Sequence, residues 1–232
     1  MPAQLQGQDL VEPVISRVVY LHGFASSAQS SKAQFFAGKF AELGIPLVAP
    51  DLNAPDFGTL TVTRMLDDVG TLLAHGEPGP VALIGSSLGG FVAWHAAARL
   101  APVLPEHHIA GIVLLAPAVT FGRDRQEDFG PGVVDEWERT GSREFFHYGV
   151  NAPRQLHYEF YRDAFTYPAA HAHVEVPTLV FQGTEDDVVK PEGVIEFCQG
   201  RPNVSLRLLQ DGHQLHVHLD EIWRETRTFL GC

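Results

Sequence analysis

The chain has 232 residues, 45% hydrophobic and 19% charged, a length and composition typical of one soluble globular domain. Its formal net charge of −12, from 28 acidic and 16 basic residues, argues against nucleic acid or an anionic membrane as a partner, since both would repel it. The two cysteines, Cys198 and Cys232, cannot form a disulfide framework and favour a reducing, cytoplasmic location. The first 17 residues carry no signal-peptide pattern, and no run approaches the ~18 apolar residues of a membrane span.

Short apolar runs recur along the chain, each followed by a segment with helical character. The expected strands are Arg17–Leu21, Pro46–Ala49, Val81–Ile84, Gly111–Ala116, Thr178–Gln182 and Val204–Leu209. Most of these runs are unbroken rather than alternating, as expected when helices cover both faces of a sheet. Alternating strands and helices imply parallel pairing through right-handed crossovers, so we predict an α/β fold with a mainly parallel sheet.

A helix is predicted between the first two strands. Its apolar residues recur every three or four positions and share one face: Ala33, Phe36, Phe40 and Leu43. Ser30 or Ser31 can cap its start, and Gly44 lies at the position where we expect a left-handed C-terminal cap.

One interval, residues 120–176, is too long for a single crossover helix and is rich in aromatic residues and histidines. We call it the insertion. Its length and composition predict either a lid over a functional site or a larger crossover with its own small core. We favour the lid because long structured insertions tend to carry function. We therefore expect one domain spanning residues 1–232 with a lid-like insertion.

The segment Gly85-Ser86-Ser87-Leu88-Gly89 joins a buried strand to a helix and has the G-x-S-x-G spacing of a nucleophile elbow. The glycines let the strand and the helix approach without Cβ clashes, and Ser87 occupies the strained position between them. The free amides of the helix, Leu88 first, then face any negative charge that develops at Ser87. The alternative is an ordinary glycine-rich turn.

The segment YLHGFASS, at residues 20–27, follows the first strand. The turn at His22-Gly23 can direct the amide of Phe24 towards Ser87, so that Phe24 and Leu88 together would form an oxyanion hole. We expect His22 to hold this loop rather than to act as the catalytic base.

Two further loops supply an acid and a histidine. The candidates for the triad acid lie after the strand at 178–182 and are Glu185, Asp186 and Asp187. We choose Asp186 because it follows the tight Gly183-Thr184 turn. After the last strand, His213 is the first side chain able to swing back over the sheet edge.

A metal site built from His213, His216 and His218 is the alternative at the last loop. This spacing is not one of zinc sites, and no complementary cluster occurs elsewhere in the sequence, so we expect neither metal nor cofactor.

Serine, then acid, then histidine, each directly after a strand, is the chain order of the α/β-hydrolase triad. With LHGF at 21–24, GSSLGG at 85–90, GTEDDVV at 183–189 and DGHQL at 211–215, the chain resembles the α/β-hydrolase superfamily. YLHGFASSAQSSKAQFF together with GSSLGGFVA is more narrowly similar to the small bacterial YqiA-like esterases.

This resemblance implies Ser87 as nucleophile, His213 as base and Asp186 as orienting acid, with the amides of Phe24 and Leu88 binding the oxyanion. Only about 16 residues precede the first strand, so the leading antiparallel hairpin of the superfamily is expected to be short or partly missing.

The expected activity is hydrolysis of small carboxylic esters, short-chain ones in particular, through an acyl-enzyme. Activity should rise with pH through a midpoint of about 6–7, because the base must be neutral. The side chains considered for substrate contact are Phe24, Trp137, Phe146 and Tyr148. A thioesterase or acyltransferase with the same triad, or a ligand-binding protein on a hydrolase scaffold, are the alternatives. The sequence does not indicate the oligomeric state.

Overall fold

Six parallel strands form the centre of the computed structural model, which describes residues 15–103 and 109–232. The strand order is β2-β1-β3-β4-β7-β8, and every neighbouring pair is parallel. The strands are β1 (Arg17–Leu21), β2 (Leu47–Val48), β3 (Val81–Ser86), β4 (Ile109–Leu115), β7 (Thr178–Gly183) and β8 (Val204–Leu209). All six predicted strands are therefore confirmed, with end points that differ by up to two residues.

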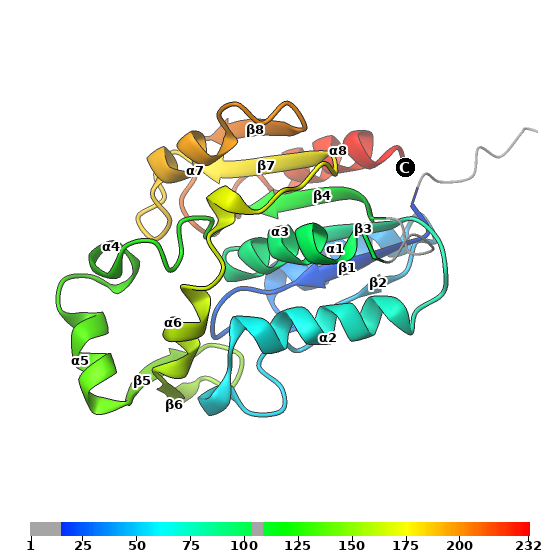
Figure 1. The fold of residues 1–232 in the computed structure, drawn as a ribbon. Helices are drawn as coiled ribbons and strands as arrows, with labels where there is room; N and C mark the ends of the chain where they lie inside the picture. The colour runs from blue at the N-terminus through cyan, green and yellow to red at the C-terminus, as the bar shows by residue number, and fades with distance from the viewer. Residues whose placement is uncertain (1–14, 104–108) are drawn as a thin grey trace, which may run out of the picture.

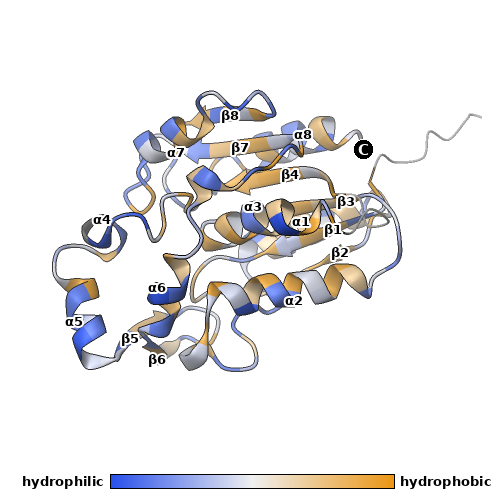
Figure 2. Ribbon diagram, viewed as in Figure 1, coloured by the Kyte–Doolittle hydropathy of each residue, from blue (hydrophilic) through white to orange (hydrophobic). Residues whose placement is uncertain are grey.

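Helices cover both faces of this sheet (Figure 1). On one face lie α1 (Ser31–Ala41) and α8 (Leu219–Leu230), and on the other lie α2 (Val62–Ala74), α3 (Leu88–Leu100) and α7 (Pro191–Cys198). Successive residues of β3 enter opposite hydrophobic clusters, Leu83 with α2 and α3 and Ile84 with α1 and α8, because side chains alternate along a strand. The central strands accordingly appear as the hydrophobic layer in Figure 2.

The predicted first helix is present as α1 with the predicted start, but it ends at Ala41, before Leu43. Ser30 is its N-cap and accepts a hydrogen bond from the amide of Ala33. Gly44, two residues beyond the C-cap Glu42, has a φ of 71°, which glycine adopts without strain. Phe36 and Phe40 are fully buried against the sheet, so the helical periodicity identified the correct face.

The insertion between β4 and β7 folds into helices and a hairpin on the side towards which the strands point (Figure 1). Its elements are α4 (Arg125–Phe129), α5 (Val133–Thr140), the antiparallel pair β5 (Ser142–His147) and β6 (Ala152–His157), α6 (Glu159–Ala164) and the short 3-10 helix η3 (Ala169–His171). Its buried Trp137, Leu156 and Phe160 belong to the same hydrophobic cluster as α2 and α3. The insertion therefore shares a core with one face of the sheet.

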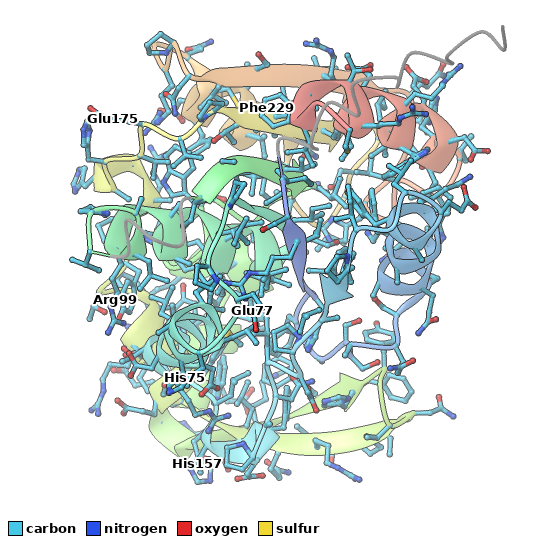
Figure 3. All side chains as sticks on the ribbon, turned by 90° about the vertical axis from the view of Figure 1, so that its right-hand side faces the viewer. His75, Glu77, Arg99, His157, Glu175 and Phe229 are labelled. Atoms are coloured by element: carbon cyan, nitrogen blue, oxygen red, sulfur yellow. The ribbon has the colours of Figure 1, made fainter. Side chains whose placement is uncertain are left out.

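Figure 3 views the molecule from the other end, where His75 and Glu77 follow α2 and Phe229 lies near the end of α8. Loops after the carboxyl ends of the strands face away from this view. The predicted leading hairpin concerns the chain before β1, most of which lies outside the described residues. Within residues 15–103 and 109–232, no helix is long and apolar enough to cross a membrane.

Candidate active site

Ser87 stands between β3 and α3 in a backbone conformation that non-glycine residues rarely adopt, with φ 53° and ψ −119°. The end of β4 holds it there: the Ser87 amide donates to the Leu115 carbonyl (2.9 Å), and the Ala118 amide donates to the Ser87 carbonyl (3.1 Å). Such strain persists only where the surrounding structure enforces it, and it projects the serine side chain out of the turn.

The glycines on either side of Ser87 are required by close backbone contacts. A Cβ on Gly85 would lie 2.3 Å from the Gly89 carbonyl oxygen, and a Cβ on Gly89 would lie 2.0 Å from the Leu21 carbonyl oxygen. No real Cβ atom tolerates such distances, so the two glycines let β1, β3 and the start of α3 approach each other.

The loop after β1 passes directly beside the nucleophile. A Cβ built on Gly23 would lie 3.3 Å from the Cβ and 3.9 Å from the Oγ of Ser87. Among the described residues, no protein acceptor binds the amide of Phe24 or that of Leu88. The absence of a protein acceptor at both amides is one condition for an oxyanion hole.

His22 holds this loop from the buried side. Its Nε2 accepts a hydrogen bond from the Leu52 amide (3.0 Å), so Nδ1 carries the proton and donates it to the Gly23 carbonyl (2.9 Å). Burial lowers the pKa of His22, which favours this neutral form. Asn53 supports the same loop by donating to the Ser26 carbonyl (2.8 Å).

Of the three acids after β7, Asp186 is the buried one, and it faces His213. Its Oδ2 lies 2.9 Å from Nδ1 of His213 and accepts from the Gln182 amide group, while its Oδ1 accepts from the amides of Val188 and Val189. Burial raises the pKa of Asp186, but these hydrogen bonds outweigh it, so the net pKa lies below its ordinary value. Asp186 therefore stays ionised, whereas Glu185 and Asp187 are exposed.

The three histidines of the last loop go to different partners. His213 contacts Asp186, His216 contacts the hydroxyl of Ser31 (3.2 Å), and His218 contacts Asp211 (3.1 Å). In the described part of the chain, no group of three or more His, Cys, Asp or Glu side chains is placed to hold a metal ion. Because Nδ1 of His213 faces the carboxylate, its Nε2 is the nitrogen left to exchange a proton with a serine.

A cavity of about 720 Å³ opens beside Ser87 and Leu88. Its aromatic lining consists of Phe24, Phe121, Phe129 and Phe160, and its charged lining of Arg123, Asp124, Asp128, Lys190, Glu192 and Glu196. Val188 and Val189, whose amides bind Asp186, also line it. The described residues form no direct hydrogen bond between Ser87 and His213, and such catalytic contacts often close only when substrate binds.

A second hollow, of about 650 Å³, is lined partly by residues of the β5–β6 hairpin, and none of the predicted catalytic residues lines it.

The candidate substrate contacts lie in different places. Phe24 lines the cavity and stacks on Phe160, with the two ring centroids 5.5 Å apart. Trp137 is fully buried inside the insertion, where its indole donates to the Leu156 carbonyl, and it is not among the described lining residues. Phe146 (48% exposed) and Tyr148 (73% exposed) contact each other at the hairpin surface, away from the cavity lining.

Sequence reasoning missed three phenylalanines of the lining and one buried cation. Phe121, Phe129 and Phe160 lie in a segment without a recognisable motif, so no spacing singled them out. Lys32, by contrast, precedes Phe36 and Phe40 by four and eight residues, the spacing of the buried face of α1. That spacing was the available signal for a lysine turned towards the protein interior.

Several known proteins share this architecture. A protein from Agrobacterium vitis S4 is 23% identical, with 94% of this chain and 90% of that chain covered and a TM-score of 0.80. Est1E from Butyrivibrio proteoclasticus, solved with ferulic acid bound, is 18% identical over 94% of this chain and 90% of its own, with a TM-score of 0.78. The mouse alpha/beta hydrolase domain-containing protein 10 is 22% identical over 97% and 92%, with a TM-score of 0.71. These likenesses confirm the predicted α/β-hydrolase fold.

A sequence relative matches a shorter stretch. Lipase LipV of Mycobacterium tuberculosis is 36% identical over 85 residues, which cover 35% of this chain. The match spans about a third (31%) of the length of that relative. A family model matches far more of the chain, residues 17–205, and therefore includes β1, the Ser87 turn and the Asp186 loop. The chain belongs to the family described as Uncharacterised protein family (UPF0227).

Proposed function

We propose that the protein is a serine hydrolase that cleaves carboxylic esters through an acyl-enzyme formed on Ser87. The observation that carries this proposal is the strained Ser87 turn at the start of α3, open to a cavity and flanked by two amides without protein acceptors. The names of LipV, a lipase, and of Est1E support ester chemistry.

In the proposed reaction, His213 accepts the Ser87 hydroxyl proton at Nε2 while Oγ attacks the ester carbonyl carbon. Asp186 accepts the hydrogen bond from Nδ1, which fixes the tautomer and stabilises the imidazolium that forms. The tetrahedral intermediate collapses as the C–O bond breaks, and the alcohol leaves with the proton from His213. A water molecule then attacks the acyl-enzyme with His213 again as base, and the acid is released.

The amides of Phe24 and Leu88 would bind the negative oxygen of both tetrahedral intermediates. Leu88 is the first residue of α3, so its amide lies at the positive end of the helix dipole. The loop of Phe24 is held by His22 and Asn53, and preorganisation of this kind avoids a reorganisation cost during the reaction.

The cavity favours a short or compact acyl group. Its apolar lining is provided mainly by phenylalanines, among them the stacked pair Phe24–Phe160. The charged side chains that complete the lining would have to be desolvated by a long hydrocarbon chain. Ferulic acid bound to Est1E supports including an aromatic ester among the substrates tested.

The test is p-nitrophenyl ester hydrolysis over acetate, butyrate, octanoate and palmitate, with methyl ferulate as the aromatic ester. We expect turnover of the short esters by the wild type and a loss of several orders of magnitude in Ser87→Ala. Ser86→Ala is the matched control, because Ser86 is the buried neighbouring serine at the end of β3. Equal rates in wild type and Ser87→Ala would contradict the proposal, and better turnover of palmitate would contradict the substrate range.

A further inference from the structure

Lys32 is a buried cation that the proposed reaction does not use. It lies in the first turn of α1 with only 6% of its surface exposed, on the face that otherwise buries Ala33, Phe36 and Phe40. A positive charge is unfavourable both in an apolar environment and at the N-terminal end of a helix. A lysine at this position therefore needs a compensating interaction.

The compensating contacts are with the loop that carries His213. The Lys32 ammonium donates a hydrogen bond to the carbonyl of Gln214, the residue directly after His213, at 3.1 Å. Its neighbour Ser31 contacts the ring of His216 at 3.2 Å. The first turn of α1 thus binds the loop on both sides of Leu215, which is fully buried and has a φ of 55°.

The same loop is held from within by Asp211. Its carboxylate accepts hydrogen bonds from the amides of Gly212 and Val217 and faces the ring of His218. The hydrogen bonds of Asp211 together with those of α1 leave the backbone around His213 little freedom. A non-glycine residue at positive φ, such as Leu215, is maintained only by such surrounding contacts.

Lys32 also contributes charge. Burial lowers its pKa to about 8, while the carboxylates of Asp186 and Asp211 act in the opposite direction. Near neutral pH the ammonium is therefore charged and offsets the negative charges of Asp186, which contacts the His213 ring, and of Asp211, which holds the same loop. Among the described residues, the titratable groups near the first turn of α1 include Tyr20, Asp186, Asp211, His213, His216 and His218.

We propose that Lys32 is a positioning residue for His213: it holds the loop through the Gln214 carbonyl and balances the charges of Asp186 and Asp211. The inference rests on the proposed function in that it takes His213 as the base. Without the ammonium, the two carboxylates would favour the imidazolium more strongly, so less of the neutral base would be present at a given pH.

The experiment compares Lys32→Met, which removes the charge but keeps the length, with Lys32→Arg and with Lys39→Met. Lys39 lies on the same helix, where its ammonium stands over the Phe35 ring, and serves as the matched control. We expect Lys32→Met to move the NMR titration midpoint of the His213 ring, and the rise of kcat/KM with pH, upward by about half a pH unit or more. Lys32→Arg should keep the midpoint of the wild type, and Lys39→Met should not move it. The KM of Lys32→Met should stay within about twofold of the wild-type value.

An unchanged midpoint in folded Lys32→Met, or an equal shift in Lys39→Met, would overturn the inference. If Lys32→Met does not fold, the wild type supplies the measurement: the His213 ring signals should move at the pH at which the Lys32 side-chain signals show loss of the proton, and a Lys32 titration that leaves the His213 ring signals unmoved would overturn the inference. The NMR titration needs no substrate. If Ser87→Ala kept full activity, the proposed function would fail while the effect of Lys32 on the His213 ring could still be measured.

Discussion

At the scale of single residues, the carboxylate of Asp186 has donors for both of its oxygens. Two backbone amides bind Oδ1, and the Gln182 amide group and the His213 ring bind Oδ2. This arrangement fixes the carboxylate and keeps it ionised, so it can orient the ring of His213 throughout the pH range in which a histidine titrates.

We expect Asp186→Asn to lower kcat by about 10³–10⁴-fold, because an amide cannot hold the His213 ring in the tautomer that the reaction needs. Steady-state kinetics on p-nitrophenyl butyrate would measure this loss. Glu185→Gln and Asp187→Asn, at the exposed neighbouring positions, should remain near wild type. A large loss in Asp187→Asn with an active Asp186→Asn would identify Asp187 as the acid instead.

Asp186 also predicts how stability depends on pH. Its pKa in the folded protein lies below the ordinary value of 3.8, so its ionised form stabilises the fold above pH 3.8 and loses this effect as the pH falls through the folded pKa. Asp186→Asn should therefore lower the free energy of unfolding at pH 7 by about 1.5–3 kcal/mol. In urea titrations, this difference should shrink below pH 3.8. A difference that stays constant down to pH 2.5 would exclude an ionic origin.

At the scale of elements, the site depends on how closely β1, β3 and α3 approach each other. The glycine spacing in the sequence predicted this approach, because only residues without a Cβ allow it. The same spacing led to Ser87 and to the amide of Leu88.

The insertion between β4 and β7 carried no sequence pattern that identified which of its side chains line the cavity. Phe145 and Phe146 are neighbours on β5 and must point to opposite faces of the strand, so only one of them could face inward, and the alternation alone does not say which.

Two glycine substitutions should have opposite effects. Gly89→Ala would force a Cβ against the Leu21 carbonyl and should lower the free energy of unfolding by about 3 kcal/mol or more. Gly38→Ala lies inside α1 with no atom within 4 Å of the new Cβ, and should raise it by about 0.5–1 kcal/mol. Chemical denaturation of the two variants measures both changes. A tolerated Gly89→Ala would contradict the close approach of β1 and α3.

At the scale of the whole molecule, the fold class followed from the sequence because a parallel sheet covered on both faces requires unbroken apolar strands. The strand register places Ser87, Asp186 and His213 at one edge, since each follows the carboxyl end of a strand. The position of Lys32 relative to His213 could not be read from the sequence in the same way. It depends on the distance in space between α1 and the last loop, and the contacting residues Lys32 and Gln214 lie 182 residues apart in the chain.

The shared hydrophobic cluster predicts a single cooperative unfolding transition. Trp137 and Phe160 of the insertion pack in one cluster with α2 and α3, and Asp163 of α6 binds both the amide and the hydroxyl of Thr63 in the first turn of α2. Differential scanning calorimetry should therefore show one transition whose calorimetric and van't Hoff enthalpies agree. A separate early transition, accompanied by proteolytic cleavage within residues 120–176, would show that the insertion unfolds independently.

The tip of the β5–β6 hairpin reaches back to the loop of Phe24, where the Gly149 amide faces the Ala25 carbonyl at 3.4 Å. A Cβ on Gly149 would lie 2.9 Å from the Ser27 side chain, so the two loops lie against each other. The insertion is one uninterrupted stretch between β4 and β7, but a cassette that replaces it must also fill the core that it shares with α2 and α3. A transplanted cassette must still offer a small residue at this contact, and variation there would alter turnover as well as substrate range.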